Sequence, residues 1–390
     1  SPAAGGDRGP RLIRTAYPRQ APPKPSFEGA VGWINSGPID LETLKGKIVL
    51  LDFWTYCCIN CHHILPDLEK LEAKYKNELV VIGVHSGKFD AERNTENIRR
   101  KVAEYRIKHP VVNDAEMVIW ERFDVHSWPT RVLIDADGQL VALGIDENGD
   151  PVYGIGGEGN YEGFDRVIGQ LADRFRQLGK LNEEPVVFAT EESQYADKPI
   201  LFPGKVLADA ASNRLFISDT GHNRIIQTDL EGKNPVVIGS GGRGLVDGGY
   251  DQAQFDRQQG LWLEGDVLYV ADTENHAIRA VDLKAKTVAT IVGTGKQSSR
   301  DPRRPFEGPG KSSAISSPWD VIQLPGSRTI YIAMAGTHQI YAYDPEADVV
   351  RRFAGSGYEN ILDGPPASAR FAQPSGLATD GEALYIADSE

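Results

Sequence analysis

Three cysteines stand within five residues of one another, and the 390-residue chain has no others: Cys57, Cys58 and Cys61. Cys58 and Cys61 have the C-x-x-C spacing, and at the start of a helix residues three apart lie on one face, close enough for a disulfide. Cys58 would then sit at a helix N-terminus, where unpaired N–H groups favour a thiolate, the nucleophile of disulfide exchange. The pattern therefore predicts redox chemistry.

Two other interpretations of the cluster stay open. One is an inert, buried group of thiols, because cysteine often packs as a small hydrophobic residue. The other is a zinc site that recruits His62 or His63, although neighbouring ligands on one turn do not easily form a tetrahedral cage. For Cys57 we favour packing, and a role as an accessory thiol or a modification site is the alternative.

Asp52 is the one charged residue in the apolar run 48–54, which leads to the cysteines. Because Leu50, Leu51 and Phe53 surround it, its carboxyl should point inward and have a raised pKa. We therefore interpret Asp52 as a functional acid rather than a surface group.

The elements that must hold these residues alternate between strand and helix. We predict strands over 47–54 and 79–85 and helices over 61–75, 95–105 and 162–178. A hairpin should join 130–135 to 140–143 across Asp137-Gly138. This order is typical of an α/β sandwich with a mixed sheet, in which the C-x-x-C lies between a buried strand and a helix.

The second half of the chain repeats itself. The run 217–225 recurs at 270–278 and, degraded, at 332–340, and a fourth copy begins at 386. A Gly-x-Gly landmark advances in step, at 239, 293 and 355. Such repeats of short strands predict an all-β propeller of about three and a half blades. Because the last copy stops inside its motif, we expect the propeller to be incomplete in this chain, so that it either continues beyond residue 390 or has its open edge covered by another element.

Polar positions recur inside these repeats. Asp219 and Asp272 should hydrogen-bond nearby backbone in tight turns. Asn223, His276 and His338 occupy equivalent positions, and this equivalence predicts an architectural role rather than a ring of metal-binding histidines.

Composition and charge set the outer limits. A chain that is 40% hydrophobic and 25% charged is neither wholly disordered nor collagen-like. With a net charge of −13 it repels phosphates and anionic lipids, so we expect no nucleic-acid partner. No apolar window is long enough for a transmembrane helix, so we expect no membrane insertion.

We predict four segments: an irregular Pro/Gly-rich leader over 1–28, an α/β domain over 29–180, a polar linker over 181–200 and the repeats over 201–390. The leader is similar to the mature end of an exported protein, which favours an exported or periplasmic location. No signal peptide is present, which leaves a cytoplasmic location open.

The segment 51–61 resembles the active site of the thioredoxin family, and Trp128-Pro129-Thr130 resembles the family's cis-proline loop. The resemblance implies that Cys58 is the attacking thiol and Cys61 the resolving thiol. It implies that Asp52 helps to deprotonate the resolving cysteine and that Pro129 shapes the substrate groove. The groove would also include Trp54, Trp128 and Thr130. Cys57 and the dipeptide Ile59-Asn60 depart from the family pattern at positions that tune redox potential and partner choice.

A peroxidase is a rival interpretation of the same segment. Thr55-Tyr56-Cys57-Cys58 resembles the Thr-x-x-Cys of peroxiredoxins, and Arg131 could lie near it. Leu51 stands where that motif has a proline, which counts against this interpretation.

The repeats resemble NHL repeats, and the whole combination resembles the NHL-repeat-containing protein 2 family and its bacterial homologues. That family implies a thioredoxin-like domain followed by a six-bladed propeller. We expect a thiol–disulfide oxidoreductase that needs no cofactor beyond the redox-active Cys58–Cys61 disulfide, with a protein substrate or thiol–disulfide partner that the propeller holds or selects. The alternative is a non-catalytic protein-interaction scaffold with a thioredoxin-like docking module.

Overall fold

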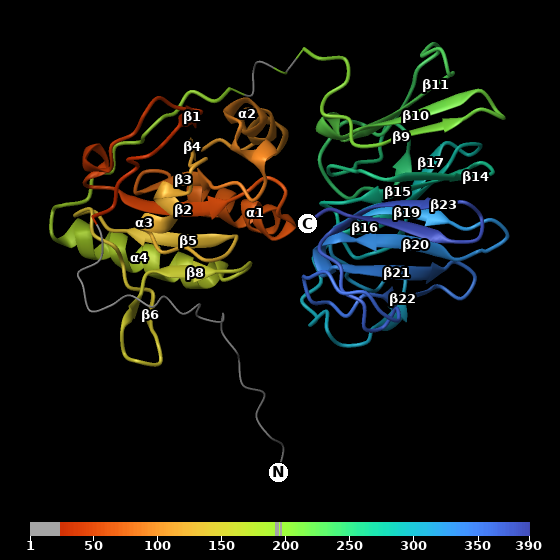
Figure 1. The fold of residues 1–390 in the computed structure, drawn as a ribbon. Coiled ribbons are helices and arrows are strands. Elements are labelled where there is room, and N and C mark those ends of the chain that lie inside the picture. The colour runs from red at the N-terminus through yellow and green to blue at the C-terminus, as the bar shows by residue number, and fades with distance from the viewer. Residues whose placement is uncertain (1–23, 192–194, 196) are drawn as a thin grey trace. The chain divides into compact units, whose positions relative to one another are not determined.

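The computed structural model describes residues 24–191, 195 and 197–390 and divides the chain into two compact units, Ser1–Asp197 and Lys198–Glu390 (Figure 1). The apolar clusters of the first unit contain no residue of the second, so each unit has its own core. Residues 1–23 of the predicted leader lie outside the described part of the chain.

A six-stranded mixed sheet forms the first unit, in the strand order β1-β4-β3-β2-β5-β8. Strand β2 pairs in parallel with β3 and antiparallel with β5. Strands β2 and β3 are buried along their whole length, which is typical of strands covered on both faces. The strands of this unit are β1 Gly32–Ile34, β2 Ile48–Trp54, β3 Leu79–His85, β4 Val111–Asn113, β5 Thr130–Ile134, β6 Gly144–Ile145, β7 Pro151–Val152 and β8 Gly154–Gly156.

The helices of this unit are α1 Ile59–Lys74, α2 Thr95–Glu104, α3 Val118–Arg122 and α4 Tyr161–Gln177. On one face of β2, Ile48 and Leu50 pack with α1 and α4. On the other face, Val49 and Leu51 pack with α3. Because side chains alternate along a strand, Asp52 lies on the same face as Leu50, the face that α1 covers.

The predicted strands and helices of this unit are confirmed within one or two residues, but the predicted hairpin differs. Its second arm makes a single bridge, between Ile134 and Leu140. The chain then diverges into the small β6–β7 hairpin, and β8 takes the place beside β5. Strand β8 forms three residue pairs with β5 and brings Ile155 into the core with α4. These contacts explain why β8, rather than the predicted arm 140–143, lies at the edge of the sheet beside β5.

The polar stretch 181–191, predicted as part of a linker, follows the surface of the first unit. The N–H of Asn182 donates to the carbonyl of Gly46 (2.8 Å), and the N–H of Glu191 donates to Oδ1 of Asn35 (3.0 Å). Phe188 packs against the apolar cluster to which α3 contributes. These contacts make residues 181–191 part of the first unit's surface.

The second unit is built from successive antiparallel sheets. Their strand orders are β12-β11-β10-β9, β13-β17-β16-β15-β14, β18-β22-β21-β20-β19 and the pair β23-β24. The strands β9, β14, β19 and β23 each form an edge of their sheets and contact one another in succession. The bounds are β9 Val206–Asp209, β10 Arg214–Asp219, β11 Arg224–Thr228, β12 Val236–Ile238, β13 Gly248–Gly249, β14 Leu261–Glu264, β15 Val267–Asp272, β16 Ala277–Asp282, β17 Thr287–Val292, β18 Glu307–Pro309, β19 Pro318–Gln323, β20 Ile330–Met334, β21 Gln339–Asp344, β22 Val349–Ala354, β23 Pro374–Thr379 and β24 Leu384–Asp388.

Equivalent positions of the repeats have the same backbone conformation. Asn223, His276 and His338 are left-handed, with φ of 51°, 47° and 56°. Each side chain accepts a backbone N–H from further along the chain, at 3.0 to 3.2 Å. The donors are Arg257, Ser317 and Gln373. The predicted architectural role of these three positions is confirmed.

The repeated aspartates bind backbone, but not in their own turns. Asp219 accepts the N–H of Leu201 (2.7 Å), 18 residues earlier. Asp272 accepts the N–H of Asp256 (2.9 Å), 16 residues earlier. They therefore anchor the chain that enters each repeat, rather than the nearby backbone that we predicted.

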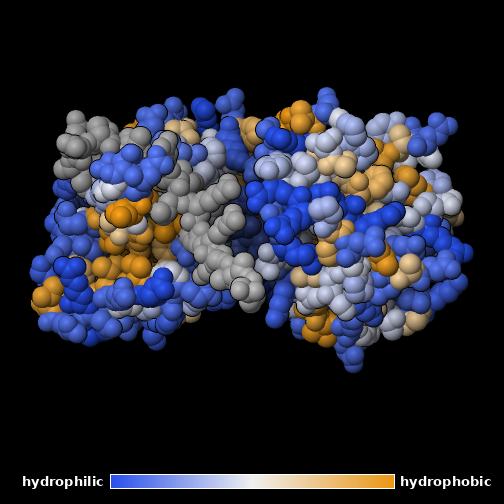
Figure 2. Space-filling model, turned by 90° about the horizontal axis from the view of Figure 1, so that it is seen from below, coloured by the Kyte–Doolittle hydropathy of each residue, from blue (hydrophilic) through white to orange (hydrophobic). Residues whose placement is uncertain are grey.

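On the face shown in Figure 2, hydrophilic residues cover most of the visible surface, and hydrophobic residues gather in smaller patches. Among the described residues, we find no helix that is both long enough and apolar enough to span a bilayer.

Candidate functional site

The three cysteines lie where β2 ends and α1 begins. Cys58 is the N-cap residue of α1, and Cys61 lies in its first turn. The N–H of Cys61 donates to the carbonyl of Cys58 (3.1 Å), which closes that turn. The C-x-x-C therefore has the predicted place at a helix N-terminus, where peptide dipoles point at the first cysteine.

Cys58 and Cys61 are adjacent thiols. They are only 3% and 1% exposed, whereas Cys57 is partly exposed. Burial, and then the hydrogen bond with Cys58, raise the pKa of the Cys61 thiol well above its ordinary value, and the charge of Asp52 adds to this. Cys61 therefore needs a proton acceptor before it can act as a nucleophile.

Asp52 is the buried carboxyl whose charge acts on Cys61. Its side chain is buried, and its Oδ1 has no hydrogen-bond partner within the described part of the chain. Burial raises the pKa of Asp52 to about 6, while the charges of His109 and Arg131 oppose the shift. A carboxyl that titrates close to neutral pH can exchange a proton with a neighbouring thiol.

The loop before β5 lies against the cysteines. The peptide bond between Trp128 and Pro129 is cis. Trp128 packs on the apolar cluster that contains Cys58 and Cys61, and its indole N–H donates to the carbonyl of Ser86 (2.8 Å). The structure thus brings the predicted loop and the C-x-x-C together.

Two residues that we predicted in a substrate groove, Trp54 and Thr130, are buried instead. Trp54 is 1% exposed and stands edge-on to His85, with ring centroids 4.9 Å apart. The hydroxyl of Thr130 donates to the carbonyl of Ser127 (2.8 Å). Trp128 is partly exposed and is therefore the groove candidate with accessible surface, whereas the groove role of Trp54 and Thr130 stays a prediction.

Arg131, which the peroxidase interpretation needs beside the thiol, is buried and paired in register with Asp52. Its terminal nitrogens donate to the carbonyls of Gly159 (2.7 Å) and Gly157 (2.8 Å), and its guanidinium lies over the ring of Phe164. These contacts commit Arg131 to the loop after β8, which weighs against a peroxide-binding role.

Sequence reasoning missed the side chains that hold the loop between β2 and α1. The N–H of Tyr56 donates to Nε2 of His85 (3.1 Å), and its carbonyl accepts the hydroxyl of Tyr105 (3.2 Å). The N–H of Cys57 donates to Oε1 of Glu92 (3.0 Å). Burial lowers the pKa of His85 to about 4, so this imidazole is neutral and accepts at Nε2. A polar residue at the end of a buried strand was the available signal for His85, and no local pattern marked Glu92.

Within the described residues, no group of three or more His, Cys, Asp or Glu side chains could hold a metal ion. The histidines after Cys61 have other partners. Nε2 of His62 hydrogen-bonds the carbonyl of Tyr56 (3.0 Å), and Nδ1 of His63 hydrogen-bonds Glu158.

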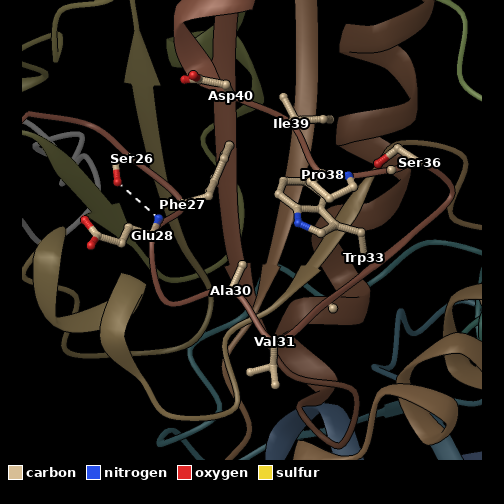
Figure 3. Close-up of a pocket in the computed structure, with 12 residues that line it drawn as sticks. Ser26, Phe27, Glu28, Ala30, Val31, Trp33, Ser36, Pro38, Ile39 and Asp40 are labelled. Atoms are coloured by element: carbon tan, nitrogen blue, oxygen red, sulfur yellow. Dashed lines mark hydrogen bonds between the residues drawn. The ribbon is translucent and has the colours of Figure 1, made fainter.

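A separate pocket of about 660 Å³ lies beside the edge strand β1, and Figure 3 shows its lining. Phe27 and Trp33 meet there edge to face, with centroids 5.2 Å apart, and the lining is mostly apolar. In the sheet, β4 and β3 separate β1 from β2, which leads to the cysteines. This pocket is therefore distinct from the thiol site.

Comparison with known proteins gives matches to both halves of the chain. A family model described as thioredoxin-like matches residues 46–140. The chain is 44% identical over 379 residues to Protein SUPPRESSOR OF QUENCHING 1, chloroplastic, of Arabidopsis thaliana, which covers 94% of this chain and 34% of that protein. It is 38% identical over 392 residues to NHL repeat-containing protein 2 of Gallus gallus, which covers 94% of this chain and 52% of that protein.

A shorter match concerns the first unit alone. The thiol-disulfide oxidoreductase YkuV of Bacillus subtilis is 29% identical over 119 residues, or 30% of this chain and 80% of that protein. The chain spans about a third and about half of the two longer relatives. These matches confirm the resemblance to the NHL-repeat-containing protein 2 family and the thioredoxin-like fold of the first unit.

Proposed function

We propose that this chain is a thiol–disulfide oxidoreductase whose active pair is Cys58 and Cys61. The observation that carries the proposal is the hydrogen-bonded pair of thiols at the start of α1, next to a buried carboxyl with a raised pKa. The similarity to a relative named as a thiol-disulfide oxidoreductase supports it.

In the reductive direction, the thiolate of Cys58 attacks one sulfur of a substrate disulfide. The Cys58–substrate bond forms, the substrate S–S bond breaks, and the second substrate sulfur leaves as a thiolate that takes up a proton. Cys61 then passes its proton to Asp52 and attacks the sulfur of Cys58. The Cys58–Cys61 disulfide forms, the first substrate sulfur leaves as a thiolate, and the two electrons of the dithiol have reduced the substrate.

The proposed reaction needs no bound cofactor, because the cysteine pair itself stores the two electrons. The substrate groove would pass Trp128, next to Pro129 and the cysteine pair. A second thiol–disulfide protein would restore the dithiol, or would remove electrons from it if the enzyme is an oxidase.

We propose further that the successive sheets of the second unit are propeller blades that hold or select the protein substrate. The support for this is the repeated strand order and the contacts between the edge strands β9, β14, β19 and β23 of successive sheets. That the substrate is a protein is part of this proposal.

A scaffold without catalysis is the second candidate, and the low exposure of Cys58 favours it. The two candidates separate with one double variant, Cys58→Ser/Cys61→Ser. If the chain is a scaffold, this variant should bind a protein partner of the parent chain as tightly as the parent chain does.

Cys58→Ser tests the catalytic proposal in the full chain. We expect the variant to lose the reduction of insulin disulfides, because the thiol proposed to form the mixed disulfide is gone. Cys57→Ser in the same chain is the matched control and should retain the activity. Insulin reduction by Cys58→Ser at the parental rate would exclude Cys58 as the attacking thiol.

A further inference from the structure

Glu92 is a buried carboxylate that faces the cysteine motif from the loop after β3. It lies in the 3₁₀ turn Asp90–Arg93 and is 2% exposed. Its Oε1 accepts the N–H of Cys57 (3.0 Å). Its Oε2 accepts the N–H groups of Lys88 (2.8 Å) and Phe89 (3.1 Å). One side chain therefore joins two loops that are more than 30 residues apart.

These donors keep Glu92 charged. Burial by itself raises the pKa of Glu92, but hydrogen bonds from the side chains of Cys57 and Thr55 and from the backbone of Cys57 and Phe89 outweigh it and lower the pKa below its ordinary value. The thiol of Cys57 therefore lies beside the carboxylate whose Oε1 the Cys57 backbone N–H contacts at 3.0 Å.

Gly87 makes this approach possible. A Cβ atom added to Gly87 would stand 2.8 Å from Cβ of Glu92, closer than two carbon atoms can pack. Any larger residue at position 87 would therefore push Glu92 away from Cys57. The contact between Glu92 and Cys57 therefore depends on the absence of a side chain at position 87.

We propose that Glu92 is a positioning residue that keeps Cys57 protonated and out of disulfide exchange, so that Cys58 alone attacks the substrate. A thiol that donates to a buried carboxylate cannot ionise without placing a second negative charge beside the first. Because only the thiolate is nucleophilic, Cys57 stays unreactive although it is the more exposed of the two neighbours. This inference rests on the proposed function and explains how two adjacent thiols acquire different roles.

The first test isolates Cys57 in the full chain as the double variant Cys58→Ser/Cys61→Ser. The rate of its reaction with 5,5′-dithiobis(2-nitrobenzoic acid) is measured from pH 6 to pH 10. Adding Glu92→Gln should increase the rate at pH 7 about tenfold and move the midpoint of the pH profile down by about one unit. Glu96→Gln, in the next helix but exposed and without contact to the cysteines, is the control and should change nothing.

The second test measures competition between the two thiols. In Cys61→Ser, a short exposure to the same reagent should label Cys58, as located by tandem mass spectrometry. Glu92→Gln should move a substantial share of the label to Cys57. Gly87→Ala, which retains the carboxylate but displaces it, should do the same and covers the case in which Glu92→Gln does not fold.

An unchanged share of label on Cys57 in both variants, with the near-ultraviolet circular dichroism of the parent, would overturn the role of Glu92. This outcome is separate from failure of the proposed function, because the labelling uses reduced protein and does not require a Cys58–Cys61 disulfide to form.

Discussion

Asp52 and Glu92 are both buried carboxylates beside the cysteine motif, yet their surroundings give them opposite protonation behaviour. Backbone and thiol donors surround Glu92 and lower its pKa, whereas Oδ1 of Asp52 has no hydrogen-bond partner in the described chain and burial raises the pKa of Asp52 to about 6. When their environments move the pKa values of two acids apart, one can exchange a proton while the other stays charged. In our account Asp52 moves a proton and Glu92 fixes a thiol.

Asp52→Asn should stabilise the protein at pH 7 while slowing resolution of the mixed disulfide. The folded protein holds a proton on Asp52 up to about pH 6, whereas the ordinary pKa is 3.8. The buried charge therefore costs stability progressively as the pH rises from about 4 to 6. The full penalty, up to ~3 kcal/mol, is present above that range.

The check is the thermal midpoint of reduced parent and variant between pH 3.5 and 8. The gain from Asp52→Asn should be present at pH 7 and vanish below pH 4. Asp173→Asn, an exposed position on α4, is the control and should show no such pH-dependent gain. A variant that is less stable than the parent at pH 7 would contradict the raised pKa of Asp52.

At the scale of elements, the site depends on the junction between β2 and α1. Gly83 in β3 stands beside the indole of Trp54, at the end of β2. A Cβ atom there would lie 2.9 Å from Nε1 of Trp54 and 3.1 Å from Cγ2 of Val111. Close packing at this point holds the strand from which the cysteine loop begins.

Gly83→Ala should destabilise the first unit by about 1–3 kcal/mol, the usual penalty for overpacking a filled core. Gly37→Ala is the matched control, because a Cβ atom at Gly37 meets nothing within 4 Å. Urea denaturation followed by tryptophan fluorescence measures both. Equal midpoints for the two variants would show that the junction accommodates the methyl group.

The predictability of these elements follows from their size and pattern. The sequence predicts β2 and β3 from their long apolar runs, and α1 and α4 from apolar residues at helical spacing. Patterns of this length rarely arise by chance. The strands β1, β4 and β8, of three residues each, carry too few residues for a period and were missed. Glu92 was missed because it lies in the polar stretch 88–97, where composition does not distinguish one buried carboxylate from exposed neighbours.

At the scale of the whole molecule, two units with separate cores carry the thiol site and the repeats. In the repeats, Arg279 is fully buried and pairs with Asp272 (2.7 Å), which is also fully buried. Burial raises the pKa of Asp272 to about 6, and the charge of Arg279 opposes the shift. Sequence equivalence located Asp272, but the buried arginine beside it follows from packing between strands that the repeat pattern does not reveal.

Arg279→Met should destabilise the second unit by about 3–5 kcal/mol, because it leaves a buried carboxylate without its charged partner. The double variant Asp272→Asn/Arg279→Met should recover part of this loss. Hydrogen exchange followed by mass spectrometry should show faster exchange in peptides of residues 198–390 and unchanged exchange in 24–191. Equal acceleration in both units would contradict separate cores.

The most direct measurement of the central claim is a glutathione redox titration of the full chain, with mass spectrometry to locate the bond. We expect a two-electron transition in which a Cys58–Cys61 disulfide forms, with Cys57 outside it. A potential near −270 mV, roughly that of thioredoxin, would indicate a reductase, and one near −120 mV, roughly that of DsbA, an oxidant. Absence of a Cys58–Cys61 disulfide at every redox poise would contradict the account and leave the scaffold as the function.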